Sequence, residues 1–245
     1  MKPITAAFVF AFALVSSAAE FRTDFLTPAY YNGHLKKEVD RFLSCVRKEQ
    51  FHHPLADAAG EIPDYTVPDM GKFGAGKGPN RTAEHHPAVD LHVGNRETLV
   101  NVYAAHDGTV TAVRNAPKYR QYLSITKEIQ DNSGQTVGKL VTLYGHVDLD
   151  LDEADGLAMN GKTVHKGDLI SKHLYSGTLG GPHLHFEIRY YRPDDQGTEE
   201  FYGFAFPGRS SPLTEPSAGG WSYGYWNPDV GYGFGFPKNH GLKLY

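Results

Sequence analysis

The sequence predicts a mainly β protein whose central part is an antiparallel sheet. Between about residues 82 and 191, runs of apolar and β-branched residues follow one another at the length of strands. The stretch Asp131-Asn-Ser-Gly134 separates two of these runs and has the composition of a hairpin turn. No long amphipathic helix interrupts the series, so neighbouring strands can pair antiparallel through short connections.

The expected strands occupy most of this central part. We place them at Ala88–Val93, Val100–Ala105, Thr109–Val113, Tyr122–Ile129, Lys139–Val147 and His183–Tyr191. After the fifth of these strands, five acidic residues lie between Asp148 and Asp155. A calcium-binding loop would need glycine at its sixth position, where this chain has Glu153. We therefore expect a solvated turn there.

The first residues have the composition of a secretory signal peptide. Lys2 gives a positive start, an apolar run extends from Ile4 to Val15, and small residues continue to Ala19. We expect cleavage near Ala19 and Glu20, and hence export to the periplasm or the extracellular space. The apolar run is too short to span a bilayer and no other segment is apolar enough, so we expect no integral membrane segment after cleavage.

We divide the chain into a signal peptide at residues 1–19, an N-terminal extension at 20–80, a β domain at 81–191 and a C-terminal extension at 192–245. The N-terminal extension holds one expected helix, between Gly33 and Gln50. The only cysteine, Cys45, lies among apolar residues at helical spacing: Leu35, Val39, Phe42, Leu43 and Val46. This pattern predicts a buried thiol, and one cysteine allows no internal disulfide.

The C-terminal extension is rich in glycine and aromatic residues. It repeats a short pattern, at Tyr202–Pro207 and again at Tyr232–Pro237. Two copies are too few for a repeat fold. The extension either presents an aromatic surface to a ligand or packs as two similar turns on the edge of the sheet, and we favour packing.

Charge excludes one class of partner. The chain has 24 basic and 28 acidic residues, a formal net charge of −4, and no block of basic residues. An interface with nucleic acid needs lysine and arginine concentrated on one face or along one segment. We therefore expect no nucleic-acid partner.

Histidine carries the strongest functional signal, with 13 copies in the chain. Most of them, His53 and His106 among them, stand in polar or turn-like settings and are expected to face solvent. Three clusters stand apart: His85-His86-Pro-Ala-Val-Asp90-Leu-His92, Tyr144-Gly-His146 and His183-Leu-His185. These clusters are the candidate site.

The third cluster lies on an expected strand, where alternate side chains face the same way. His183, His185 and Glu187 then share one face, and the apolar residues between them share the other and can enter a core. Two imidazoles side by side on a rigid strand suit zinc binding, proton transfer, or both.

A catalytic zinc site needs three ligands that donate nitrogen or oxygen, and an open position for water. His86 and Asp90, four residues apart, together with one histidine of the third cluster would meet that need. The other histidine of that cluster and His146 would then be available for proton transfer. By strand alternation, Tyr144 shares a face with His146, and His92 shares a face with Asp90.

These motifs resemble those of a known family. In this order, His86-x-x-x-Asp90, Tyr144-x-His146 and Gly181-Pro-His183-Leu-His185-Phe-Glu187 are similar to the LytM/lysostaphin-type zinc metallopeptidases, peptidase family M23. The stretches Ala105–Val110, Val164–Ile170 and Ser176–Gly181 resemble the family's connecting turns. The similarity covers about residues 81–191.

The resemblance implies an antiparallel β metallopeptidase domain and a role for each motif residue. The implied zinc ligands are His86, Asp90 and His185. His183 would face the reacting water with His146 as its partner, and either of the two could be the general base. Tyr144 would help to stabilise the tetrahedral oxyanion.

Two features depart from the family's pattern. Ala88 stands where the family usually has glycine, two residues before the aspartate. His85 and His92 flank the first motif and could compete for the metal. We favour His86 because only His86 has the four-residue spacing to Asp90.

The implied activity is hydrolysis of peptide crosslinks in bacterial peptidoglycan by an exported zinc endopeptidase. Both D-alanyl–diaminopimelate and glycyl–glycine bonds are cut within the family, and the motifs do not choose between them. The alternatives are a non-catalytic LytM-like module that binds or activates partners, and a secreted β domain that binds cell-wall glycan.

Overall fold

The structure is a computed structural model of the chain and describes residues 21–22, 41–42, 44–46, 51–72, 88–116, 119–191, 193 and 222–226. The expected signal peptide, His85 and His86 lie outside the described residues. The described elements are β1 (Phe21–Arg22), β2 (Tyr65–Thr66), the 3-10 helix η2 (Asp69–Gly71), β3 (Val89–Val93), β4 (Leu99–Tyr103), β5 (Gly108–Ala116), β6 (Arg120–Gln130), β7 (Thr136–Gly145), α3 (Leu149–Ala154), β8 (Thr163–Val164), β9 (Leu169–His173), β10 (Leu184–Tyr191) and β11 (Ser222–Trp226). Residues 41–42 and 44–46 are helical.

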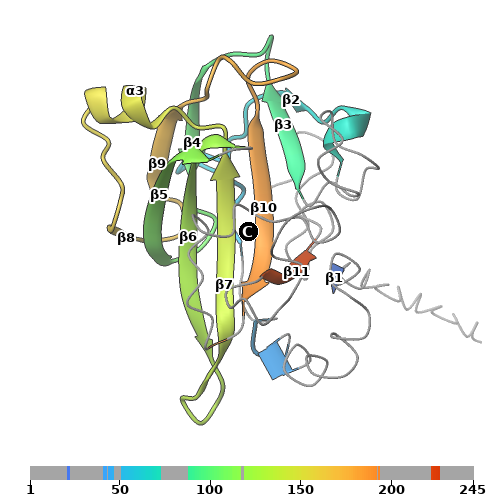
Figure 1. The fold of residues 1–245 in the computed structure, drawn as a ribbon, viewed down its shortest axis with the longest axis vertical. Helices are drawn as coiled ribbons and strands as arrows, with labels where there is room; N and C mark the ends of the chain where they lie inside the picture. The colour runs from blue at the N-terminus through green and yellow to red at the C-terminus, as the bar shows by residue number, and fades with distance from the viewer. Residues whose placement is uncertain are drawn as a thin grey trace, which may run out of the picture.

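The fold is mainly antiparallel β, as the sequence predicts. Within the described residues, one sheet has the strand order β1-β11-β10-β7-β6-β5-β8, and β3 joins it by pairing with β10 and β2. Strands β10, β7, β6 and β5 run side by side along the long axis of the molecule (Figure 1). A second sheet contains β4 and β9. Strand β10 holds the centre, with β7 on one side and β3 and β11 on the other.

The strand register divides the main sheet into two faces. Phe186 is opposite Tyr144, which is opposite Leu123, and all three are buried in the main core. The next residues in register are His185, Gly145 and Tyr122. Because side chains alternate along a strand, these point to the other face, which carries the histidine site.

The segment after β7 differs from its prediction. Instead of a solvated turn, Leu149–Ala154 forms helix α3, and the carboxylate of Asp148 caps it by accepting the backbone N–H of Leu151 at 3.1 Å. Leu149 and Asp152 are buried, and Asp152 accepts the N–H of Lys172 in β9 at 2.7 Å. The acidic composition of this segment did not predict a helix, because the helix is held in place by the burial of Leu149 and Asp152.

The predicted hairpin between β6 and β7 is confirmed. Asp131 Oδ1 accepts the backbone N–H groups of Ser133 at 2.8 Å and Gln135 at 3.1 Å. Gly134 has φ of +80°, which glycine adopts without steric cost. These contacts fix the register of β6 against β7, and with it the placement of the following His146.

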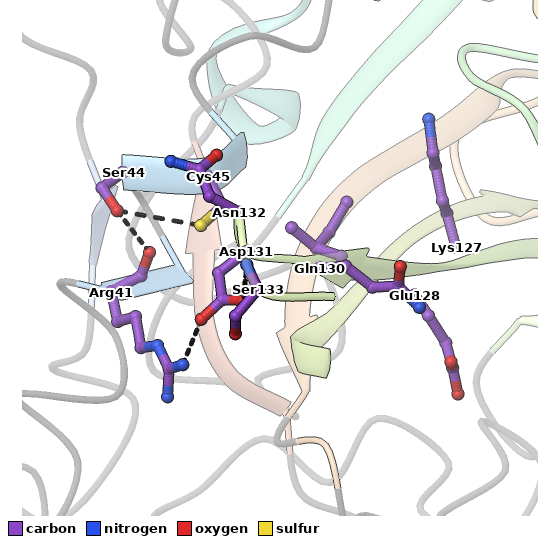
Figure 2. A pocket seen from close by; sticks show the side chains of 10 residues that line it. Arg41, Ser44, Cys45, Lys127, Glu128, Gln130, Asp131, Asn132 and Ser133 are labelled. Atoms are coloured by element: carbon purple, nitrogen blue, oxygen red, sulfur yellow. Dashed lines mark hydrogen bonds and ion pairs between the residues drawn. The ribbon is translucent and has the colours of Figure 1, made fainter. Parts of the chain in front are cut away.

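The described part of the N-terminal extension packs into the same core as the sheet. Phe42 and Val46 of the helical residues are fully buried. Cys45 packs against the same core but is only partly buried, whereas the sequence predicts a buried thiol. Figure 2 shows Arg41 forming an ion pair with Asp131 across a hollow of about 600 Å³ between the helix and the hairpin. This hollow lies at the end of β6 remote from the histidine site.

The expectation that His53 and His106 face solvent is wrong, because each is 1% exposed. The Nδ1–H of His106 donates to the Asp107 carbonyl at 2.8 Å, and its Nε2 lies 3.0 Å from the hydroxyl of Thr142. Burial lowers the pKa of His106 to about 4. The polar residues next to His106 in the sequence suggested exposure, but its side chain is buried and hydrogen-bonded inside the protein. No helix of the described residues is long and apolar enough to cross a membrane.

We predict that His106 makes the free energy of unfolding depend on pH in the acidic range. Between pH 6.5 and 4 the unfolded chain binds a proton at this position and the folded chain does not, so stability falls as the pH drops. The loss at pH 4 is about 3 kcal/mol. Urea unfolding from pH 7.5 to 4 should show a shallower fall for His106→Gln than for the parent. The matched control is His165→Gln, at an exposed position; equal slopes for all three proteins would refute the prediction.

Candidate active site

The site is built on the pairing of β3 with β10. Asp90 and His185 are register partners, and Asp90 Oδ1 lies 2.9 Å from His185 Nδ1. The other ring nitrogen, Nε2, lies 2.6 Å from Glu187 Oε1. Burial alone would lower the pKa of His185, but the hydrogen bonds and charges of Asp90 and Glu187 raise it to about 9.

Beneath His185 lies a buried charged row. Glu187 and Arg189 are both fully buried and form an ion pair on the same face of β10. The hydroxyl of Tyr119 donates to Glu187 Oε1 at 2.7 Å. Although burial acts to raise the pKa of Glu187, Arg189, His185 and Tyr119 hold it below its usual value. The row therefore keeps a carboxylate against Nε2 and leaves Nδ1 directed at Asp90.

His183 and His146 complete the cluster. Their ring centroids are 4.7 Å apart, and His146 lies 5.7 Å from His185. The Nδ1–H of His183 donates to the Gly181 carbonyl at 2.9 Å, and that of His146 donates to the Tyr119 carbonyl at 3.1 Å. Since a carbonyl only accepts, Nδ1 carries the proton in each neutral ring, and Nε2 presents a lone pair.

The electrostatics keep His146 neutral. Burial, and then the neighbouring His183 and His185, lower the pKa of His146 to about 3. The Nε2 of His183 is 3.6 Å from Asp90 Oδ1, so His183 faces the same carboxylate as His185. Two imidazoles that both carry a proton on Nδ1 thus stand beside the pair of Asp90 and His185.

His92 shares the face of Asp90, as strand alternation predicts. Its ring stacks on His183 with centroids 4.7 Å apart and planes inclined by 21°. Burial, and then the charge of His183, lower the pKa of His92. His92 therefore supports His183 from the side opposite to His146, since β3 and β7 flank β10 on opposite sides.

The expectation that Tyr144 shares a face with His146 is wrong. Strand β7 ends at Gly145, and His146 has φ of +63°, which breaks the strand alternation. Tyr144 is fully buried in the main core, where its hydroxyl accepts the N–H of Ala105 at 2.7 Å and lies 3.1 Å from Thr142 Oγ1. Burial raises the pKa of Tyr144. The structure does not bring this phenol to the histidine cluster.

Tyr119 is the tyrosine beside the site, and sequence reasoning missed it. Its ring centroid lies 5.0 Å from that of His185. A Cβ on Gly145 would lie 3.0 Å from Tyr119 Cδ1 and 3.2 Å from His185 Cβ, so this glycine makes room for both rings. The one signal in the sequence was the glycine between Tyr144 and His146, and only the folded structure brings Tyr119, which precedes β6, against that glycine.

The N-terminal extension also reaches the site. Strand β2 pairs with β3, and a Cβ on Gly71 of η2 would lie 2.7 Å from Asp90 Cβ. Among the described residues, no group of three or more potential ligands could hold a metal ion. Two expected ligands, Asp90 and His185, do converge, and their oxygen and nitrogen donors, with Glu187 behind the imidazole, fit zinc.

A comparison of the sequence with known families bears on this arrangement. The sequence model of peptidase family M23 matches residues 84–198, a range that includes all the described members of the cluster. Residues 84–198 therefore carry a domain of the M23 peptidase type. The resemblance read from the three motifs is thereby confirmed, and the family is one of peptidases.

Several solved structures are similar to this part of the chain. A zinc-containing peptidase from Vibrio cholerae is 28% identical, with a TM-score of 0.39, over 57% of this chain and 36% of that one. Lysostaphin of Staphylococcus simulans is 18% identical, with a TM-score of 0.36, over 56% and 48%. Csd3 of Helicobacter pylori is 23% identical, with a TM-score of 0.37, over 59% and 33%. This chain spans between about a third and a half of their lengths. No curated protein sequence matches it.

The two tyrosines should separate stability from metal binding. Tyr144→Phe leaves the buried N–H of Ala105 without its acceptor and should lower the free energy of unfolding by about 1–3 kcal/mol. Tyr119→Phe removes a donor to Glu187 and should weaken zinc binding by about tenfold. Urea unfolding and competitive zinc titration measure the two effects. A Tyr144→Phe protein of full stability but reduced turnover would contradict the placement of this hydroxyl.

Proposed function

We propose that this chain is an exported zinc endopeptidase that hydrolyses peptide crosslinks of bacterial peptidoglycan. The observation that carries the proposal is the arrangement of His185 between Asp90 and Glu187, with His183 and His146 beside it. Export rests on the composition of residues 1–19, and the substrate rests on the family of the domain.

The residues that would hold the metal are His86, Asp90 and His185. Zinc bound there would lower the pKa of a water ligand and polarise the scissile carbonyl. Glu187 orients the ring of His185 and favours Nδ1 as the donor, since its carboxylate retains the proton on Nε2. Arg189 and Tyr119 hold Glu187 in turn, so the ring of His185 cannot rotate without losing its contact with a carboxylate that is fixed in place.

His146 and His183 would move the protons. Each ring presents Nε2 to the site, because both Nδ1 protons are held by backbone carbonyls. One ring can take a proton from the attacking water and then, protonated on Nε2, give that proton to the leaving amine, and the geometry allows either ring to serve. The side chain of His92 stacks on His183 and limits its rotation.

The alternative to a peptidase is a non-catalytic module that binds or activates a partner. Such a module would need only the shape of the domain, and not the two aligned proton carriers or the buried row beneath His185. Incubation of the zinc-loaded protein with defined muropeptides, with mass analysis of the products, separates the two. Defined products that require zinc support the peptidase; intact muropeptides bound without cleavage support the module.

The expected ligands should control metal content. Purified protein should hold about one zinc per chain, and His86→Ala, Asp90→Ala and His185→Ala should each lose most of it, because each removes one of three ligands. Elemental analysis after dialysis measures this. His85→Ala is the matched control and should retain zinc. Loss of zinc in His183→Ala with retention in His185→Ala would mean that the pair of histidines is reversed.

The expected proton carriers should control turnover alone. His146→Ala and His183→Ala should keep zinc and fold but lose at least about a hundredfold in kcat, since general acid and base groups commonly contribute that much. Turnover on a purified crosslinked muropeptide measures the effect, with zinc content and circular dichroism recorded for each variant. Near-normal turnover in both variants would refute the mechanism.

A further inference from the structure

An arginine stands at the His146 end of the histidine cluster. Arg120 begins β6, and the residues on either side of it hold His146: the Tyr119 carbonyl accepts from the ring, and the Gln121 carbonyl accepts the backbone N–H at 3.0 Å. The Arg120 guanidinium carbon lies 4.7 Å from the ring centroid of Tyr175, and an N–H donates to the Tyr175 hydroxyl. The N–H of Tyr175 in turn donates to the His146 carbonyl at 2.7 Å.

A second arginine stands at the opposite end. Arg96 lies in the turn after β3, where its backbone N–H donates to the Val93 carbonyl at 3.0 Å. A Cβ on Gly181 would lie 2.8 Å from Arg96 Nη1, so the guanidinium rests against the backbone of Gly181. The carbonyl of Gly181 is the one that holds the ring of His183.

The two arginines therefore flank the candidate proton carriers. His183 lies between His92 and His146, at 4.7 Å from each ring centroid. His92 belongs to β3 and His146 follows β7, and these strands border β10 on opposite sides. Arg96 follows the first of these strands and Arg120 is tied to the end of the second, so a chain bound across His183 would pass from one guanidinium to the other.

The backbone at both positions is unusual for arginine. Arg96 has φ of +67° and Arg120 has φ of +63°. An L-residue rarely adopts this region because its Cβ approaches a backbone oxygen, whereas glycine adopts it freely. Non-glycine residues in such conformations concentrate at functional sites. Each side chain is thus kept at a steric cost that glycine would remove.

Both guanidinium groups are available to a ligand. Arg96 and Arg120 are exposed, and neither pairs with a carboxylate among the described residues. Other arginines of the described part are paired: Arg41 with Asp131, Arg114 with Asp150 and Glu153, and Arg189 with Glu187. A guanidinium matches a carboxylate through two parallel hydrogen bonds.

We propose that Arg96 and Arg120 bind free carboxylates of the substrate on the two sides of the bond that is cut. This inference rests on the proposed peptidase function and names its substrate class, an anionic peptide. Of the two bonds that the family motifs leave open, D-alanyl–diaminopimelate has a free carboxylate on the carbon next to the scissile nitrogen. A glycyl–glycine bridge has none within reach, so the arginines select the former.

The test compares two substrates that differ in one charge. The first is a crosslinked muropeptide dimer with the D-alanyl–diaminopimelate bond. The second is the same dimer with the diaminopimelate carboxyl next to that bond converted to the amide. For the zinc-loaded protein, kcat/KM should be about tenfold or more higher on the acid than on the amide, with the difference mainly in KM, since a charge-assisted hydrogen bond is lost.

The informative variants are Arg96→Gly and Arg120→Gly. Glycine suits the positive φ at both positions, so fold and zinc content should be retained while the guanidinium is removed. The preference for the acid should fall to about twofold or less when the arginine that contacts that carboxylate is replaced by glycine. Lysine at the same position, Arg96→Lys or Arg120→Lys, should restore part of the preference. Arg114→Gly, at an arginine paired with Asp150 and Glu153, is the control and should keep the full preference.

Failure of the inference differs from failure of the proposed function. Equal kcat/KM on acid and amide by the parent protein, or an unchanged preference in both glycine variants, would overturn the role of the arginines while the peptidase stands. If no dimer is cut, the peptidase proposal fails, and calorimetric binding of the two dimers decides the inference. Tighter binding of the acid that is lost in a glycine variant supports carboxylate recognition; equal binding overturns it.

Discussion

The candidate site depends on one buried interaction, the placement of His185 between two carboxylates. Asp90 faces one ring nitrogen and Glu187 the other, and Arg189 balances the second carboxylate inside the protein. Removing one partner of such a row leaves a buried charge uncompensated, at a cost of about 3–5 kcal/mol. The same contacts that stabilise the row also hold the ring of His185 so that, in the proposed zinc site, Nδ1 would be the nitrogen that meets the metal.

The antiparallel register connects this row to the rest of the fold. Asp90 reaches His185 because β3 and β10 pair at those residues, and Gly145 of β7 lies opposite on the other side. The absence of a side chain on Gly145 admits Tyr119, and the positive φ of His146 then turns its ring toward His183. A shift of one residue in either pairing would send these groups into the core.

Much of this arrangement could be predicted from alternation alone. The sequence predicts the strands that carry His185 and Asp90, although β10 begins one residue after His183, and it predicts the shared face of Asp90 and His92, because apolar and polar residues alternate there. Alternation failed for Tyr144, since it cannot foresee that β7 ends one residue before His146. Tyr119 and the pairing of Arg189 with Glu187 arise from contacts between strands, which spacing along one strand does not encode.

The central claim is that His185 Nδ1 and Asp90 form part of a zinc site, with Nε2 reserved for Glu187. Crystals of the zinc-loaded protein, measured on both sides of the zinc absorption edge, test it most directly. The account predicts one strong anomalous peak within about 2.0–2.2 Å of His185 Nδ1 and of an Asp90 oxygen. A peak on His185 Nε2, or a peak that excludes Asp90, would contradict it.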